Sequence, residues 1–438
     1  MSPTGATGLD GRLGTGETVR LRLVWLAAVL GSVTLFAALV AATATSTPDR
    51  EPTLITSPSW RAVTDIAGPV DRGPSADEAW LALGSVPGEG TRWGEMVRIA
   101  LLDLRQLSGP GGAVAAGAGS SWNYDWPRDT AFVAVALARA GHHGEALETL
   151  GFLQRVQLPD GGFEARYLLD GSGTPDGRAR QSDGAGWVLW ALDEVGRASG
   201  VGVAGTLVGP PASARELLDD ATEFALAETN DGRRLPPPSP DYWEVGVRRT
   251  SLGTVAPLLA GLRASQQMYA ALDESALSRR SGAAAARLAT IVDARFADGY
   301  ERFGSRRFRD GGGRDAAVTF LMPPFADSAT PRLVDAWLLY QSDALRPAGG
   351  LAPGERWKQD GISWTPETAM VAYTAAMSGH RELAETWMDW LSAHRTAWGS
   401  LPEKVLANGA PAGPAPLAWT SALVILTAAE LDPTSAHR

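Results

Sequence analysis

The sequence predicts an all-α protein in which about twelve helices form two concentric rings, an α/α toroid, preceded by one transmembrane helix. Apolar residues recur at three- and four-residue spacing through most of the chain beyond residue 75, which is the period of an amphipathic helix. Alternating β-branched runs are scarce, so no extensive sheet is expected. The helices come in pairs joined by short glycine turns, such as ARAGHHGEAL and AMSGHRELAE. An irregular helical solenoid is the alternative, and the absence of a fixed-period repeat weighs against a regular one.

Residues 1–22 are expected to form a cytoplasmic tail, and residues 23–44 a transmembrane signal-anchor helix. The second segment carries no charge and is long enough to cross a hydrocarbon core of about 30 Å. Arg20 and Arg22 precede it, and positive charge on this flank holds the N-terminus inside. We therefore expect a single-pass protein of the cell membrane whose folded part lies outside the cytoplasm. The alternative is secretion after cleavage of a signal peptide, because the Ala-Thr-Ala run before residue 45 resembles a cleavage site.

Residues 45–75 are rich in Thr, Ser and Pro and lack periodic apolar spacing, so they predict an extended linker. The remaining part, residues 76–434, is expected to form one helical domain. Gly, Pro or Asp-Gly breakers follow its apolar periodic segments. The predicted helices are 76–84, 95–107, 130–141, 143–157, 185–198, 214–228, 252–272, 274–296, 331–345, 365–379, 381–395 and 417–431.

Long connections between these helices hold an unusual share of the tryptophans, prolines and carboxylates. They run over residues 109–128, 157–183, 230–250, 345–364 and 396–418. Loops carried by a rigid scaffold are where binding and catalytic residues concentrate. We expect the chemistry of the protein in these loops.

Composition excludes several classes of function. The net charge is −10, and no long basic stripe is present, so nucleic acid is not an expected partner. The chain has no cysteine, which excludes a disulfide framework, a thiolate nucleophile and a thiolate metal site. The five histidines show neither metal-ligand spacing nor a local serine partner, so a Ser-His-Asp hydrolase is not expected.

Two glutamates stand in stiff, aromatic-rich loops. Glu244 follows Tyr242 and Trp243 in PPPSPDYWEVGVRRT, and Glu403 lies in AWGSLPEKVLANGAPAGPAPLAW. Acetal hydrolysis needs two carboxyl groups, one to protonate the leaving oxygen and one to activate water or attack. Aromatic neighbours exclude water, which raises the pKa of an acid, and they stack on sugar rings. The alternative for either glutamate alone is a loop salt bridge or a helix cap.

A polar and aromatic cluster, SSWNYDWPRD, directly precedes an apolar helix at residues 120–129. Arg128 and Asp129 can form charge-assisted hydrogen bonds with sugar hydroxyls. Trp122, Tyr124 and Trp126 can form a stacking wall for a sugar ring. The alternative is that Asp129 caps the helix and Arg128 pairs with a neighbouring acid. We expect both roles together, because helix N-termini would point polar groups into the mouth of the toroid.

Five motifs in this order resemble glycoside hydrolase family 15, the glucoamylase-like enzymes, over roughly residues 90–430. WPRD is similar to the segment that holds the terminal sugar in that family, QSDGAGWVLWAL to its Asp-Gly helix start, and DYWE to the loop with the general acid. GERWKQDGISW resembles the substrate segment of the family, and GSLPEKV…PLAWTSALV resembles the final motif with the general base. From these matches and from the aromatic neighbours of the motifs, the residues expected to bind substrate are Tyr124, Trp126, Arg128, Asp129, Asp183, Trp243, Arg356, Trp364 and Trp419.

The resemblance implies an (α/α)6 barrel and an inverting exo-acting α-glycosidase. Glu244 would be the general acid and Glu403 the general base, with their carboxyl groups roughly 6.5–9.5 Å apart. The partner would be a carbohydrate substrate, and neither a metal nor an organic cofactor would be needed. The sequence departs from the family at Val245, at Gln359-Asp360 and at Lys404. These positions shape outer subsites, so a short oligosaccharide or an envelope glycan is the expected substrate rather than starch.

Two other functions stay open. The departures beside Glu244 favour a non-catalytic glycan-binding protein on the same barrel. The segment QRVQLPDGGF and the acids Asp219, Asp220 and Glu223 suggest a terpenoid or prenyl enzyme that binds Mg²⁺ and a diphosphate. The simpler interpretation is that the first is a helix stop and that the acids form a solvated helix face.

Overall fold

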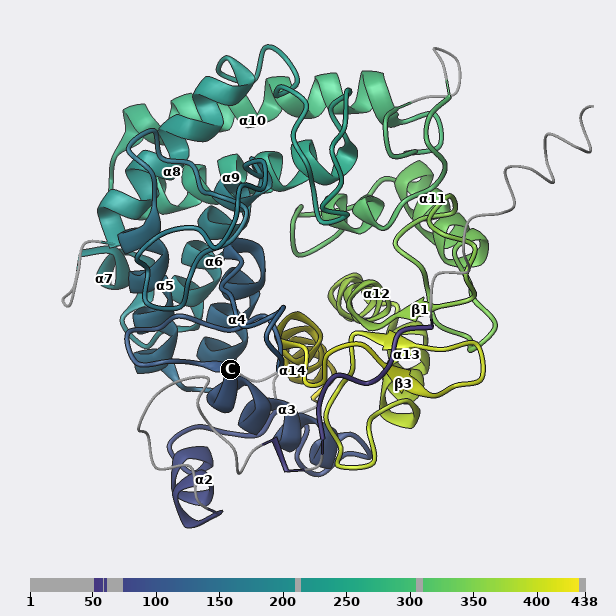
Figure 1. Cartoon of the computed structure of the whole chain (residues 1–438). Helices are drawn as coiled ribbons and strands as arrows, with labels where there is room; N and C mark the ends of the chain where they lie inside the picture. The colour runs from purple at the N-terminus through teal and green to yellow at the C-terminus, as the bar shows by residue number, and fades with distance from the viewer. Residues whose placement is uncertain (1–50, 58, 61–73, 209–213, 305–309, 433–438) are drawn as a thin grey trace, which may run out of the picture. The chain divides into compact units, whose positions relative to one another are not determined.

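The computed structural model describes residues 51–57, 59–60, 74–208, 214–304 and 310–432 of the chain (Figure 1). The expected cytoplasmic tail at 1–22 and the expected transmembrane helix at 23–44 lie outside the described residues. Within the described residues, no helix combines the length and the apolar character that a membrane span requires. The elements below all belong to one compact unit, Pro52–Arg438.

The described part of this unit is mostly helical, as predicted. Its elements are α2 (Pro74–Leu81), α3 (Gly94–Leu107), α4 (Pro127–Arg139), α5 (His143–Val156), α6 (Asp183–Ala198), α7 (Gly202–Val208), α8 (Ala214–Thr229), α9 (Leu252–Ala271), α10 (Ser275–Phe296), the 3-10 helix η2 (Ala316–Leu321), α11 (Pro331–Asp343), β1 (Ser363–Trp364), α12 (Thr365–Met377), α13 (Arg381–Ala393), β2 (Lys404–Val405), β3 (Pro411–Ala412) and α14 (Ala418–Leu431).

Six of the described elements form a closed inner ring, visible in Figure 1. In order around the ring they are α4, α6, α9, η2, α12 and α14, and each contacts the next, with α14 returning to α4. The α-helices among them are buried nearly all round. In α12, for example, every residue from Thr365 to Ala375 is buried. Side chains of the ring meet at its axis, where the ring of Phe132 lies 4.7 Å from Trp190 and 5.1 Å from Trp187.

An outer layer of α3, α5, α8, α10, α11 and α13 covers this ring, and each of these helices packs on an inner element that adjoins it in the chain or in space. The outer helices are amphipathic. In α13 the buried residues are Ala384, Trp387, Met388 and Leu391, which recur at the spacing of one helix face. Six outer and six inner elements thus alternate along the described chain, an arrangement consistent with an (α/α)6 barrel.

The twelve barrel elements are not quite the twelve that periodicity predicts. The inner position between α9 and α12 is filled by η2, whose six residues are too few to show a helical period. The predicted helix at 76–84 is α2, which packs against α3 outside the ring. Helix α7 was not predicted either, because its small residues carry no clear apolar stripe.

A small antiparallel sheet, ordered β1-β2-β3, fastens two of the long loops together. Trp364 pairs with Lys404, and Lys404 in turn pairs with Ala412. The described residues of the expected linker also reach this region. Leu54 bridges Gly413, the Ile55 N–H donates to the Gly413 carbonyl at 2.9 Å, and Trp60 is buried. The backbone at residues 53–55 is therefore hydrogen-bonded to Gly413, in the loop that precedes α14.

Candidate active site

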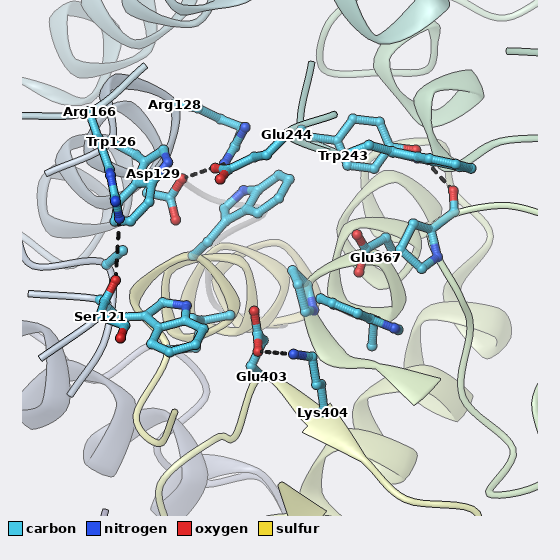
Figure 2. Close-up of a pocket in the computed structure, with 18 of the residues that line it drawn as sticks. Ser121, Trp126, Arg128, Asp129, Arg166, Trp243, Glu244, Glu367, Glu403 and Lys404 are labelled. Carbon is cyan, nitrogen blue, oxygen red and sulfur yellow. Dashed lines mark hydrogen bonds and ion pairs between the residues drawn. The ribbon is translucent and has the colours of Figure 1, made fainter. Parts of the chain in front are cut away.

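All five predicted loops contribute to one cavity of about 330 Å³ at one end of the barrel (Figure 2). This volume lies within the range of small-molecule sites. The cavity is lined by aromatic rings, by carboxylates and by cationic side chains. The aromatic wall includes six tryptophans: Trp122, Trp126, Trp243, Trp357, Trp364 and Trp419. The charged groups are Asp129, Glu244, Glu367 and Glu403 with Arg128, Arg166, Arg178 and Lys404.

Glu244 enters the cavity from a tight turn that follows Asp241. The Glu244 N–H donates to the Asp241 carbonyl at 2.7 Å, and the Trp243 N–H donates to Asp241 Oδ1 at 3.0 Å. The φ angle of Glu244 is 54°, in the left-handed region of the backbone that residues other than glycine seldom adopt. Such strain persists only where the surrounding structure holds it, and it concentrates at functional sites.

A buried ionic network beneath the turn holds it in place. The Arg302 guanidinium contacts Asp241 Oδ1 at 2.6 Å and Asp315 Oδ2 at 3.1 Å, and all three side chains are almost fully buried. Tyr242 donates its hydroxyl to Asp315 Oδ1 at 2.6 Å. The Arg302 guanidinium also stacks 3.7 Å from the ring centre of Trp243. These contacts tie both residues before Glu244 to the barrel, so the glutamate is presented from a rigid base.

Glu403 enters from the opposite side, at the edge of the small sheet. Its N–H donates to the Pro414 carbonyl at 2.8 Å, and its own carbonyl accepts from the Thr365 N–H at 3.0 Å. Lys404 Nζ lies 2.8 Å from Glu403 Oε2 and 4.4 Å from the ring centre of Trp364. Burial raises the pKa of Glu403, while Lys404 and a hydrogen bond with Trp122 lower it.

The two glutamates of the predicted pair therefore share one cavity, although they come from loops far apart in the chain. Figure 2 shows both carboxylates directed into it from different walls. The negative charge of Glu244 is among the influences that raise the pKa of Glu403, so the two groups are electrostatically coupled. Glu244 is itself paired with Arg178 and lies 3.8 Å from Arg128 Nη2.

The start of α4 places two charged side chains in the same cavity. Trp126 occupies the N-cap position in extended conformation without a side-chain cap, and Pro127 follows at the first helical position. Arg128 Nη2 lies 3.1 Å from Asp129 Oδ2, and its guanidinium stacks 4.7 Å from the ring centre of Trp419. Burial raises the pKa of Asp129 to about 6, against the opposing effect of Arg128. Asp129 therefore faces the cavity and also pairs with Arg128. This pairing is the one that the alternative interpretation of Arg128 expected.

Three of the residues selected from the sequence lie outside the cavity lining. Tyr124 packs edge-on against Trp126, with Arg166 over its ring at 4.4 Å. Asp183 is buried at the first residue of α6, accepts from Trp187 Nε1 at 3.3 Å and acts electrostatically on Arg128. Burial raises the pKa of Asp183 to about 7. Arg356 contacts Asp310 at 2.5 Å and is half exposed.

The other selected residues all line the cavity, namely Trp126, Arg128, Asp129, Trp243, Glu244, Trp364, Glu403 and Trp419. Sequence reasoning missed Arg166, Arg178, Trp357 and Glu367 as lining residues. The two arginines belong to the predicted loop 157–183, and Trp357 belongs to GERWKQDGISW, so loop membership could have found them. Glu367 gives no such signal, because an acid in the first turn of a helix is ordinary.

The acids considered for a diphosphate enzyme do not line the cavity. Asp219 pairs with Arg215 at 2.8 Å and accepts from the Tyr269 hydroxyl, while Glu223 pairs with Arg280 at 2.5 Å. Asp160 pairs with Arg180 at 2.8 Å in the turn after α5. Within the described ranges, no group of three His, Cys, Asp or Glu side chains is arranged to hold a metal ion.

The architecture is shared with solved structures of glucoamylase-like glycosidases. No family model and no curated protein sequence matches the chain. A wild-type glycosidase superposes with a TM-score of 0.63 at 22% identity, over 81% of this chain and 98% of the glycosidase. A bacterial glucoamylase complexed with acarbose gives 0.63 at 15% identity, over 81% of this chain and 57% of that one. The glucoamylase from Saccharomycopsis fibuligera gives 0.61 at 17% identity, over 84% and 97%. At these identities the likeness shows a common fold.

Proposed function

We propose that the protein is a glycoside hydrolase that removes terminal α-linked sugars from a short oligosaccharide or an envelope glycan with inversion of configuration. The observation that carries the proposal is the placement of Glu244 and Glu403 on one cavity walled by six tryptophans. The shared fold adds support, since solved structures of this fold include a glycosidase variant with glucose and a glucoamylase with acarbose.

In this mechanism Glu244 donates its proton to the glycosidic oxygen as the bond to the anomeric carbon breaks. Glu403 accepts a proton from a water molecule that attacks the anomeric carbon from the opposite face. The product is a sugar of inverted anomeric configuration and a free hydroxyl on the leaving group. Contacts of Glu403 with Lys404 and Trp122 stabilise the ionised form that a base requires.

The cavity wall suits a sugar ring in a second way. Five of its indole N–H groups are buried without a hydrogen-bond partner among the described residues, those of Trp126, Trp243, Trp357, Trp364 and Trp419. Buried donors normally have a partner, so an occupant rich in hydroxyl groups would satisfy them. The flat indole faces would stack on the apolar face of a pyranose.

We also propose that this activity serves the outside of the cell. The uncharged segment at 23–44, behind two arginines, supports a membrane-anchored enzyme whose domain at 76–434 meets extracytoplasmic glycans.

Variants Glu244→Gln and Glu403→Gln test the assignment. Each is expected to lower kcat by about 10² to 10⁴-fold, the usual contribution of a general acid or base. Glu244→Gln should affect aryl glycosides with good leaving groups much less than disaccharides, because only poor leaving groups need the proton. Exposed Glu382 on α13 gives a matched control, Glu382→Gln, with unchanged activity. NMR of the first-formed anomer reports inversion, and wild-type rates in both cavity variants would refute the proposal.

A second candidate is a glycan-binding protein without catalysis. It is favoured by the ion pair between Arg178 and Glu244, because Glu244 is the group that would have to carry the proton for catalysis. This candidate predicts that the wild-type protein binds α-linked oligosaccharides and releases no reducing sugar from them.

A further inference from the structure

Glu367 is a buried carboxyl group that lines the cavity and that the mechanism above does not use. It lies in the first turn of α12, directly after Pro366, and the residue is only 5% exposed. Figure 2 shows its carboxyl group directed into the pocket. Its Oε2 atom has no hydrogen-bond partner among the described residues.

The other three cavity acids each have a cationic partner. Asp129 pairs with Arg128, Glu244 with Arg178, and Glu403 with Lys404. Glu367 forms no ion pair within the part of the chain that the structure describes. Arg128 is close enough to act on it electrostatically, but that guanidinium is already engaged by Asp129 and Trp419.

An unpaired carboxyl group in such a place favours its neutral form. Burial raises the pKa of Glu367 to about 8, and the charge of Glu403 adds to the effect, while Arg128 opposes it. A protonated carboxyl group carries one O–H donor together with acceptor oxygens. A buried donor or acceptor without a partner destabilises the protein, so a group of this kind calls for a partner from outside the chain.

From its position on the cavity wall and its unpartnered oxygen, we propose that Glu367 is a substrate-binding residue whose carboxyl group hydrogen-bonds a hydroxyl of the bound sugar. The inference rests on the proposed function in one respect, that the cavity accepts a sugar. The inference goes beyond the proposed function by naming a specificity-determining residue that plays no part in the proton transfers of Glu244 and Glu403.

The test compares Glu367→Gln with Glu367→Met in the whole chain. The amide of glutamine can still donate and accept hydrogen bonds, so Glu367→Gln should bind sugar within about threefold of the wild-type protein. Methionine keeps the volume and removes the polar group, and sugar affinity should fall about 10- to 100-fold. The control is Glu382→Met, at the exposed first-turn acid of α13, which should match the wild-type affinity.

Affinity is measured by calorimetry with glucose, maltose and a set of monodeoxy methyl α-glucosides, and thermal unfolding verifies that each variant is folded. The deoxy sugar that lacks the contacted hydroxyl should bind equally to the wild-type protein and to Glu367→Met. Unchanged affinity in a folded Glu367→Met variant would overturn the inference, and so would an equal loss in both variants. Binding without hydrolysis in the wild-type protein would refute the proposed catalysis alone. A folded wild-type protein that binds none of these sugars would overturn the inference, while the proposed hydrolysis is judged separately by the release of reducing sugar from α-linked oligosaccharides.

Discussion

Lys404 follows Glu403 directly, and its ammonium group lies 2.8 Å from the carboxylate that the mechanism uses as the base. A general base must be ionised to accept a proton. Burial raises the pKa of Glu403, and Lys404 lowers it. Replacing Lys404 with methionine should therefore raise this pKa further. We predict that the acid limb of the pH profile of kcat/KM moves to higher pH in Lys404→Met than in the wild-type protein.

The matched variant is Lys404→Arg, which retains the positive charge and should hold the acid limb near its wild-type position. A role for Lys404 in packing alone predicts the opposite pattern, with a lower rate in both variants and no displacement of the limb. An acid limb that stays in place in Lys404→Met would show that the ammonium group does not control the ionisation of Glu403.

Residue types in loops were enough to predict much of the candidate site. Trp126, Arg128 and Asp129 lie together in SSWNYDWPRD, and polar or aromatic residues packed this densely before an apolar helix have few structural explanations. Arg356 stands in an equally suggestive segment, yet its side chain turns outward to Asp310. Glu367 is the opposite case. It stands in an ordinary helix start, yet its side chain lines the cavity. Side-chain direction depends on tertiary packing, which local sequence does not report.

At the scale of elements, the inner ring depends on close approach between α6 and α9. Gly186 and Gly261 face each other there, and a Cβ atom on Gly186 would lie 2.2 Å from the Pro257 carbonyl oxygen. A methyl group at this point must push two helices apart where both are buried. We predict that Gly186→Ala lowers the free energy of unfolding by about 1–3 kcal/mol, because overpacking exceeds the gain in helix propensity.

Gly144 on α5 gives a matched helical control, because a Cβ atom there would meet nothing within 4 Å. Gly144→Ala should be neutral or stabilising by up to about 1 kcal/mol. Urea unfolding followed by tryptophan fluorescence measures both variants. Equal urea midpoints for the two variants would contradict a close approach of α6 and α9 at Gly186.

Helical periodicity was sufficient to predict most of the barrel because long helices repeat the 3.6-residue pattern several times. Helix α9, which is apolar almost all round, and α13, with one buried face, are distinguishable as inner and outer on pattern alone. The 3-10 helix η2 is not, because six residues complete too few turns to show a period. Its place in the ring is set by the neighbours α9 and α12.

At the scale of the whole molecule, the barrel buries several carboxyl groups that have no adequate counter-charge. Burial is the largest influence in each case, and it raises the pKa of Asp125 to about 7, that of Asp183 to about 7 and that of Glu367 to about 8. In an unfolded chain the same groups would titrate near pH 4. Between about pH 5 and pH 8 these three groups therefore hold more protons in the folded protein than in the unfolded chain.

The sign of the pH dependence follows from this difference in bound protons. Where the folded state binds more protons, the free energy of unfolding falls as the pH rises, so the protein should be more stable at pH 5.5 than at pH 8.

Asp125 lies outside the cavity and accepts from the Val114 N–H at 2.8 Å, a bond that an amide oxygen can also accept. Asp125→Asn removes one carboxyl group whose pKa is raised by about 3 units. That group contributes on the order of 4 kcal/mol to the pH dependence of the free energy of unfolding. The urea midpoint should therefore depend less on pH in this variant. The exposed variant Glu382→Gln should keep the wild-type slope. A midpoint that rises from pH 5.5 to pH 8 in the wild-type protein would mean that these carboxyl groups are ionised inside the barrel.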